Sequence, residues 1–249
     1  MSQIFLSPHM DDTTLSCGAG IAQLQAAGVA VRVVNVMAGH PPDPLPDSPL
    51  VRELHQRWGA GAQPITIRRA EEARANALLG AEVIFMDIPD AIYRTAGGAA
   101  LYTAGDAHLF GAVHPDDPAG EILKATAPPD AERVYVPAGV GGHVDHCLTR
   151  DWALRHLPAS KLIFYEDYPY AAHQHAVSIP SHDVAPRLRY VGEREFEIKC
   201  AAIACYASQI STFWRDIAHM RRDLRDYMTV VGGGQLAERY WVVSGTTDD

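Results

Sequence analysis

The chain has 249 residues, of which 47% are hydrophobic and 20% carry charge, and its formal net charge is −9. This length and composition predict one globular domain over residues 1–249 with a sizeable core. The acidic balance excludes binding that depends on clustered Lys and Arg along a nucleic-acid backbone. The apolar runs fall short of the roughly 18 residues that a membrane span needs.

Hydrophobic periodicity and turn residues predict an alternation of strands and helices. The expected strands cover residues 3–8, 31–39, 82–91, 133–140, 161–167 and 238–244. The expected helices cover residues 11–28, 49–58, 68–79, 120–127 and 141–157. Residues 187–196 are expected to form a strand or hairpin arm, and residues 197–228 a helical stretch with one break. This order predicts an α/β fold, a Rossmann-like three-layer sandwich with a mainly parallel central sheet.

Two further stretches of the sequence carry expectations of their own. Residues 95–120 form a long irregular segment, and such segments in compact domains are often functional. On the expected helix 68–79, Arg68 and Arg69 precede Glu71 and Glu72, a pattern that favours a solvent-exposed charged face.

The cysteines and the N-terminus bear on the compartment. None of the four cysteines forms a C-x-x-C pair, so neither a zinc knuckle nor a redox motif is predicted. The N-terminus lacks the basic flank and apolar run of a secretory leader. We therefore expect a cytoplasmic protein with reduced thiols. We expect a small-molecule partner rather than nucleic acid or a membrane, and a homo-oligomer is compatible with this composition.

The pattern His-x-Asp-Asp occurs twice in the sequence. The first string, His9 to Asp12, follows an expected strand and precedes an expected helix, which places it at the carboxyl edge of the sheet. The second string, His114 to Asp117, lies in the irregular segment and is followed by Pro118. Because Asp is a good helix cap and Pro suits the first helical turn, we expect the second string to start a helix rather than bind metal.

A second His-rich cluster, G-G-H-V-D-H at residues 141–146, also follows an expected strand and opens a helix. Parallel strands can deliver both strand-end clusters to one place at the sheet edge. The chain would then supply His9, Asp12 and His146 as metal ligands. Two imidazoles and one carboxylate, with positions left for water, are typical of a catalytic zinc site. Asp11 and Asp145 remain for proton transfer or for holding ligands in place.

A family resemblance rests on two motifs, SPHMDDTTLSCG (7–18) and PAGVGGHVDHCLTR (137–150). Together they resemble the PIG-L/LmbE-like deacetylases, which use zinc to remove acetyl groups from N-acetylglucosamine-type amino sugars. The resemblance extends to IPDAIYR (88–94), FYEDYPYA (164–171) and KCAAIACYASQ (199–209), so it spans most of the chain. It implies a zinc-dependent hydrolase that removes the N-acetyl or a related N-acyl group from a small amino-sugar glycoside.

Carried over position by position, the resemblance implies the same three zinc ligands and gives roles to four further residues. Asp11 becomes the general base for a metal-activated water. His143 stabilises the oxyanion or protonates the leaving amine, and Asp145 orients a neighbouring imidazole. Arg94 matches a position that binds substrate. The sequence departs from the family pattern at Met10, where Pro is usual, and at Thr13, where Glu is usual.

Two other functions remain open at this point. His9 and Asp11 with a distant His also match the two-His, one-carboxylate triad of non-haem iron oxygenases. The alternation of strands and helices disfavours that interpretation, because the oxygenases that we can compare have all-β folds. A non-catalytic sugar-binding protein on the same fold is the other alternative, since fold does not fix function.

Overall fold

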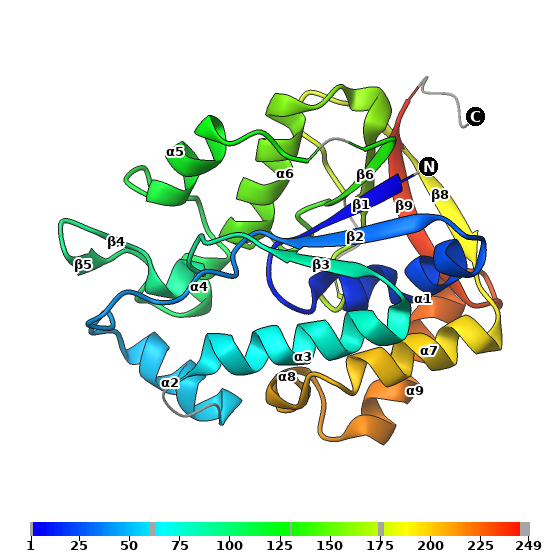
Figure 1. Cartoon of the computed structure of the whole chain (residues 1–249), viewed down its shortest axis with the longest axis horizontal. Coiled ribbons are helices and arrows are strands. Elements are labelled where there is room, and N and C mark those ends of the chain that lie inside the picture. Colours follow the sequence, from blue (N-terminus) through cyan, green and yellow to red (C-terminus); the bar gives the residue numbers. More distant parts are fainter. Residues whose placement is uncertain (1, 60–62, 130, 174–176, 245–249) are drawn as a thin grey trace.

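One seven-stranded sheet organises the computed structural model, which describes residues 2–59, 63–129, 131–173 and 177–244 (Figure 1). Its strands are β1 (Ser2–Ser7), β2 (Ala30–Asn35), β3 (Glu82–Phe85), β6 (Arg133–Pro137), β7 (Leu162–Tyr165), β8 (Val184–Tyr190) and β9 (Ala237–Val243). They lie in the order β3-β2-β1-β6-β7-β9-β8. The first five strands in this order run parallel, and β9 is antiparallel to both of its neighbours. The predicted α/β fold with a mainly parallel sheet is confirmed.

Helices cover both faces of the sheet. The long ones are α1 (Asp12–Ala26), α2 (Pro49–Trp58), α3 (Pro64–Leu79), α5 (Pro118–Ala125), α6 (Val144–His156), α7 (Glu193–Ile203), α8 (Ala207–Phe213) and α9 (Ile217–Val231). Helices α1, α3 and α7 lie below the sheet in the view of Figure 1, and α5 and α6 lie above it. Within the described ranges, no helix combines the length and hydrophobicity of a membrane span.

The alternating side chains of β1 show why the sheet needs cover on both faces. Ile4 and Leu6 pack into the core beneath α5 and α6, whereas Phe5 packs into the core that α1, α3 and α7 close. Phe5 pairs in register with Val33 of β2 and Tyr135 of β6, and these residues share its face. Successive residues of a strand point to opposite faces, so a continuous apolar run indicates a strand buried on both sides.

Three expectations about local structure differ from what is observed. Residues 193–196 begin helix α7, because the backbone N–H of Gly192 donates to the Glu195 carboxylate, as in a capping box. The stretch after α7 is interrupted twice, between α7 and α8 and between α8 and α9. The irregular segment contains a small hairpin and one helical turn: β4 (Thr95–Ala96), β5 (Ala99–Ala100) and α4 (Asp106–Leu109).

The exposed charged face expected on α3 is wrong for three of its four members: Arg68, Glu71 and Glu72. Their exposed fractions are only 4%, 2% and 0%. Helix α3 packs against α7, and the chain that follows α7 supplies donors to the two carboxylates. Glu71 accepts hydrogen bonds from Ser208, and Glu72 accepts one from the Tyr206 hydroxyl. Buried carboxylates are tolerated when such donors satisfy them.

Candidate active site

The ends of four parallel strands surround one cavity of about 290 Å³. The polar residues that follow these strands are His9 after β1, Asp90 after β3, His143 after β6 and Asp167 after β7. The sheet order grows outward in both directions from β1 and β6, and such a switch point leaves a crevice at the carboxyl ends of the strands. The two clusters expected to meet at the sheet edge do meet there.

Asp12 lies between two imidazoles. Its Oδ2 atom is 3.3 Å from Nδ1 of His9 and 3.3 Å from Nε2 of His146. Ligand atoms bound at about 2.0–2.1 Å to a tetrahedral zinc ion lie roughly 3.3 Å apart, so the distances from Asp12 to the two imidazoles suit ligands of one zinc ion. The nitrogens of His9, His143 and His146 also lie within 4.8 Å of one another, so His143 borders the same place.

His146 is oriented by Asp167, which follows strand β7. Its Nδ1 lies 2.6 Å from Asp167 Oδ1, and the other oxygen of that carboxylate accepts the backbone N–H of Val140. The proton on Nδ1 leaves a lone pair on Nε2. That Nε2 atom is buried and has no hydrogen-bond partner among the described residues. A carboxylate behind a histidine and an orphaned nitrogen in front of it fit a metal ligand.

His9 is held in the same way by Asp145. Its Nε2 lies 3.0 Å from Asp145 Oδ2, which leaves Nδ1 facing Asp12. Burial opposes a charge on this imidazole, but the carboxylates of Asp90, Asp12 and Asp145 raise its pKa well above the usual value. Burial likewise opposes a charge on His146, and Asp12 and Asp167 raise its pKa to about 9. The carboxylates therefore favour a cation at this place, either protons or a metal ion.

Asp11 has a rare backbone conformation, and its carboxylate does not cap helix α1. Its φ of 140° is rare for a residue with a side chain, and such strain often marks functional positions. Although Asp11 stands at the start of α1, its carboxylate caps none of the N–H groups described there. Burial raises the pKa of Asp11 to about 8, opposed by the guanidinium of Arg68, whose Nη2 is 3.7 Å away. The carboxylate lines the cavity, next to Asp12.

His143 stands at the N-cap of α6 and also lines the cavity. Its Nδ1 accepts the backbone N–H of Asp145 at 3.2 Å, which places the proton of the neutral ring on Nε2. Burial and the nearby His9 keep the pKa of His143 well below the usual value. The ring is therefore neutral in the metal-free protein and has one N–H to offer.

Arg94 lies behind the site, away from the cavity. Its guanidinium donates to Asp145 Oδ1 at 2.5 Å and to Asp117 Oδ2 at 3.0 Å, and the residue is only 3% exposed. Burial alone would raise the pKa of Asp145, but Arg94 and His9 hold it far below the usual value. The sequence predicted that Arg94 binds substrate, and these contacts place it beside the residue that orients His9.

The second His-x-Asp-Asp string starts helix α5, as expected. Asp117 is its N-cap and accepts the backbone N–H of Ala119 at 2.9 Å. The His114 side chain is 40% exposed, and its Nδ1 lies 4.0 Å from an oxygen of Asp116. Asp117 does more than cap, because its carboxylate also accepts from the Tyr102 hydroxyl and from Arg94.

Sequence reasoning missed the contributions of Asp90 and Arg68, and it named Asp167 only as a strand-end candidate for the pocket lining. Asp90 caps a short 3-10 helix, Ala91–Tyr93, and one of its oxygens is 3.7 Å from His9 Nε2. Arg68 stands over the Trp58 ring and reaches Asp11 from α3. The one available signal was the position of Asp167 at the end of a strand.

Thr13 stands where the family pattern usually has Glu. Its buried hydroxyl has no hydrogen-bond partner in the described part of the chain.

Comparison with known proteins places this site in a family. A model of the family described as PIG-L, GlcNAc-PI de-N-acetylase, matches residues 4–157. A 2'-N-acetylparomamine deacetylase of Niallia circulans is 26% identical, over 96% of this chain and 90% of that protein. A 2'-N-acetylparomamine deacetylase of Streptomyces fradiae is 32% identical, over 71% of this chain and 60% of that protein.

The fold is shared with solved structures of deacetylases. A teicoplanin deacetylase, described as its zinc-inhibited form, superposes with a TM-score of 0.80 and 27% identity, over 99% of this chain and all of that one. The matched segment 4–157 includes β1, β6 and the first turn of α6, which carry the two His-containing clusters.

Proposed function

Since the chain belongs to the PIG-L family of GlcNAc-PI de-N-acetylases, we propose that it is a zinc-dependent N-deacetylase acting on a small amino-sugar glycoside. One observation carries the proposal. Asp12 is 3.3 Å from a nitrogen of each of two imidazoles, and the other nitrogen of each imidazole faces a buried carboxylate. Carboxylates placed in this way fix the tautomer and orientation of imidazoles that bind a metal ion, which supports a metal centre at this place.

His9, Asp12 and His146 would hold the metal ion, with Asp145 and Asp167 behind the two imidazoles. When bound, a divalent zinc ion supplies a Lewis acid that polarises an amide carbonyl and lowers the pKa of water towards about 7. His143 is a candidate for a fourth ligand, because one of its nitrogens lies near those of His9 and His146. We leave it outside the ligand set because its side chain, with the proton on Nε2, lines the cavity, where a donor to the reacting amide is useful.

Asp11 is the group that accepts the proton of the attacking water. Its carboxylate is not used for capping, and it lies in the cavity beside Asp12. A cation on Asp12 lowers the pKa of Asp11 from the value of about 8 that burial gives it, so the base form is present near neutral pH. Arg68 supports that form from 3.7 Å away.

His143 acts on the opposite side of the amide. Nδ1 of the neutral ring accepts the Asp145 backbone N–H, so the proton is on Nε2, and the side chain lines the cavity. This N–H can donate to the oxyanion of the tetrahedral intermediate. The leaving nitrogen must gain a proton, and Asp11 is the group that has just accepted one.

The substrate class follows from the relatives and from the cavity. Two relatives are named for 2'-N-acetylparomamine, and a solved structure is that of a teicoplanin deacetylase. The cavity of about 290 Å³ is at the lower end of the size range of ligand pockets, which suits a single sugar ring near the metal ligands.

The iron oxygenase alternative makes a different demand on the first string. It uses Asp11 as the carboxylate ligand, whereas the oxygen lying 3.3 Å from both imidazoles belongs to Asp12. The mainly parallel sheet also differs from the all-β folds of the oxygenases that motivated this alternative. Both observations favour hydrolysis.

The test is hydrolysis of defined N-acetyl amino sugars. Metal-stripped protein is reloaded separately with Zn²⁺, Co²⁺ and Fe²⁺, and the acetate and free amine that it releases are measured. We expect the two products in equal amounts with zinc or cobalt, and loss of both after chelation. Turnover that needs iron and 2-oxoglutarate would replace the proposal with the oxygenase, and binding of the sugar without acetate release would replace it with the non-catalytic alternative.

A further inference from the structure

A second and larger cavity, of about 700 Å³, adjoins the active-site cavity. The two cavities share three lining residues, Tyr170, Thr212 and Phe213, so they are neighbours across a common wall. Tyr170 also approaches the metal-ligand cluster, because its ring centroid is 5.7 Å from that of His146. The larger cavity is therefore close enough to the metal-ligand cluster to receive a part of a substrate that extends beyond Tyr170.

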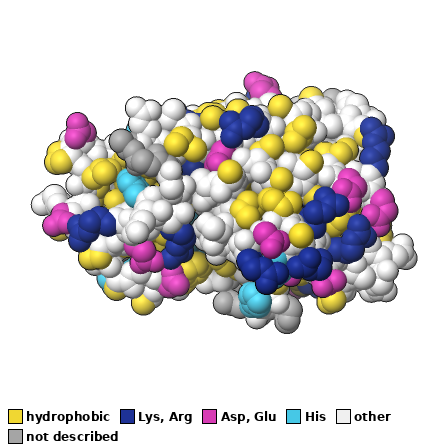
Figure 2. Space-filling view, turned by 90° about the horizontal axis from the view of Figure 1, so that it is seen from below, with side chains coloured by type: hydrophobic (Ala, Val, Ile, Leu, Met, Phe, Trp, Pro, Cys, Tyr) yellow, Lys and Arg dark blue, Asp and Glu magenta, His cyan; other side chains and the backbone are white. Residues whose placement is uncertain are grey.

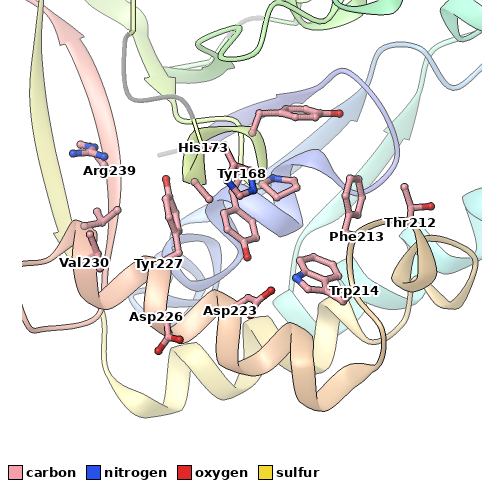
Figure 3. Close-up of a pocket in the computed structure, with 14 residues that line it drawn as sticks. Tyr168, His173, Thr212, Phe213, Trp214, Asp223, Asp226, Tyr227, Val230 and Arg239 are labelled. Atoms are coloured by element: carbon pink, nitrogen blue, oxygen red, sulfur yellow. The ribbon is translucent and has the colours of Figure 1, made fainter. Parts of the chain in front are cut away.

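The larger cavity has an aromatic wall made by buried side chains. The rings of Tyr168 and Trp214 are stacked with their centroids 6.2 Å apart, and Tyr227 packs on Tyr168 with centroids 4.7 Å apart. Tyr168 and Trp214 are 4% and 5% exposed, so their positions are fixed by packing. Figure 3 shows Tyr168, Phe213, Trp214 and Tyr227 around the cavity. Phe213 and Tyr227 are partly exposed and line the cavity, so their surfaces suit the apolar face of a saturated ring.

The charged side chains that line this cavity are mainly acidic. Asp223 and Asp226 line it from α9, and in Figure 3 the Asp223 carboxylate lies below the hydroxyl end of Tyr168. Asp223 is 3.2 Å from His219 Nε2, and Nδ1 of that ring accepts the backbone N–H of Arg215. Arg239 also lines the cavity, but its charge is matched by Glu166 at 2.7 Å.

The three arginines of α9 lie outside this cavity, because Arg221, Arg222 and Arg225 line a different one. Arg221 and Arg225 form bidentate ion pairs with Glu197 and Glu193 of α7. Figure 2 shows basic and acidic side chains interleaved on the face that includes these helices. Among the described residues, no Lys or Arg lies within ion-pair distance of Asp223 or Asp226. Within the described residues, the carboxylates of Asp223 and Asp226 therefore have no lysine or arginine as an ion-pair partner.

We propose that the larger cavity binds a second ring of the substrate, and that this ring carries at least one ammonium group, which Asp223 recognises. The inference rests on the proposed function, because it assigns the acetamido ring to the active-site cavity. The aromatic wall contacts the face of the second ring, and the Asp223 carboxylate selects a ring that carries a positive charge. The substrate class is thereby narrowed to a cationic aminoglycoside of two or more rings.

The test compares two probes by calorimetry. One is a glucosaminyl aminocyclitol with free cyclitol amines, and the other is the same compound with its cyclitol amines acetylated, so that only charge and the added acetyls differ. We expect the cationic probe to bind about fivefold more tightly to the unmodified chain, with a preference that shrinks at high salt. Asp223→Asn should remove most of that preference.

Asp116→Asn is the matched control, because it makes the same charge change at a side chain that is 72% exposed and lines neither cavity. It should keep the full preference. Equal affinity for the two probes, or an unchanged preference in Asp223→Asn, would overturn the inference.

Acetate release from a simple N-acetylglucosamine glycoside, measured separately, reports the proposed function alone. A chain that prefers the cationic probe through Asp223 but releases no acetate disproves the proposed function only. A chain that releases acetate but shows no charge preference disproves the inference only.

Discussion

Two segments of this chain carry the pattern His-x-Asp-Asp, and one is buried at the sheet edge whereas the other lies in a partly exposed loop. In the first, Asp12 lies 3.3 Å from nitrogens of His9 and His146, at the carboxyl end of β1. In the second, His114 is 40% exposed in a loop, and Asp117 caps α5. The difference comes from the elements that flank each string. Only a string at the switch point of the sheet meets an imidazole from another strand.

The two strings are nevertheless joined through the interior. Asp117 accepts a hydrogen bond from Arg94, Arg94 donates to Asp145, and Asp145 faces Nε2 of His9. The ion-paired side chains of Arg94, Asp117 and Asp145 are at most 1% exposed. The second string thus supports the first one without binding a metal. The predictions below test both the difference and the connection.

The largest expected effect separates the two strings as metal sites. His146→Ala and Asp12→Asn should lose bound zinc and all measurable acetate release, because each removes a ligand. The combined variant His114→Ala with Asp117→Asn should keep about one zinc ion per chain. Metal analysis after gel filtration makes the comparison. Loss of zinc from the combined variant together with retention in Asp12→Asn would reverse the assignment.

The next effect concerns the neighbour of Asp12. Asp11→Asn keeps the shape of the side chain but cannot accept a proton, so we expect zinc to be retained and kcat to fall by about 10² or more. Metal content and steady-state rates on one N-acetyl amino sugar give the answer. Near-normal turnover would remove Asp11 from the mechanism.

A smaller effect is expected for the carboxylate behind His146. Asp167→Asn should weaken zinc binding by roughly 10–100-fold, because the amide no longer fixes the tautomer and orientation of the imidazole. Competition with a chelator measures the affinity. Glu166→Gln is the control, since Glu166 contacts Tyr227, Arg239 and Trp241 but no metal-ligand candidate. Equal zinc affinity in Asp167→Asn and the unmodified chain would contradict the orienting role.

The smallest effect tests the connection between the strings. Arg94→Lys keeps the charge but not the two-pronged geometry, so we expect kcat to fall about tenfold with KM nearly unchanged. Asp117→Asn should act in the same direction and more weakly. A rise in KM that exceeds the fall in kcat would instead support the contact with substrate that the sequence suggested for Arg94.

Much of the architecture could be predicted from local patterns. The continuous apolar run of β1 and the Pro-capped start of α5 each depend on a few adjacent residues, and both were found. The approach of His9 and His146 could be anticipated, because each lies in a His-containing cluster at the junction between a strand and the helix that follows it. Helix α2 matched its expected bounds because Pro49 opens it and Gly59 closes it in the left-handed conformation.

The residues that were missed depend on neighbours distant in the sequence. Arg68 and Glu72 look like a solvated face until α7 packs over α3. Asp167 gains its role only because β7 lies next to β6, and strand order cannot be read from local periodicity. The position of Arg94 behind Asp145 likewise depends on how the segment after β3 meets the start of α6. Each of these contacts is set by tertiary packing rather than by local sequence.

The most direct test of the central claim is an anomalous difference map at the zinc absorption edge, from crystals of the zinc-loaded protein. The account predicts one strong peak bound by His9 Nδ1, Asp12 Oδ2 and His146 Nε2, at distances of about 2.0–2.2 Å, and no peak at His114 to Asp117. A peak at the second string, or none at the first in protein that contains stoichiometric zinc, would contradict it.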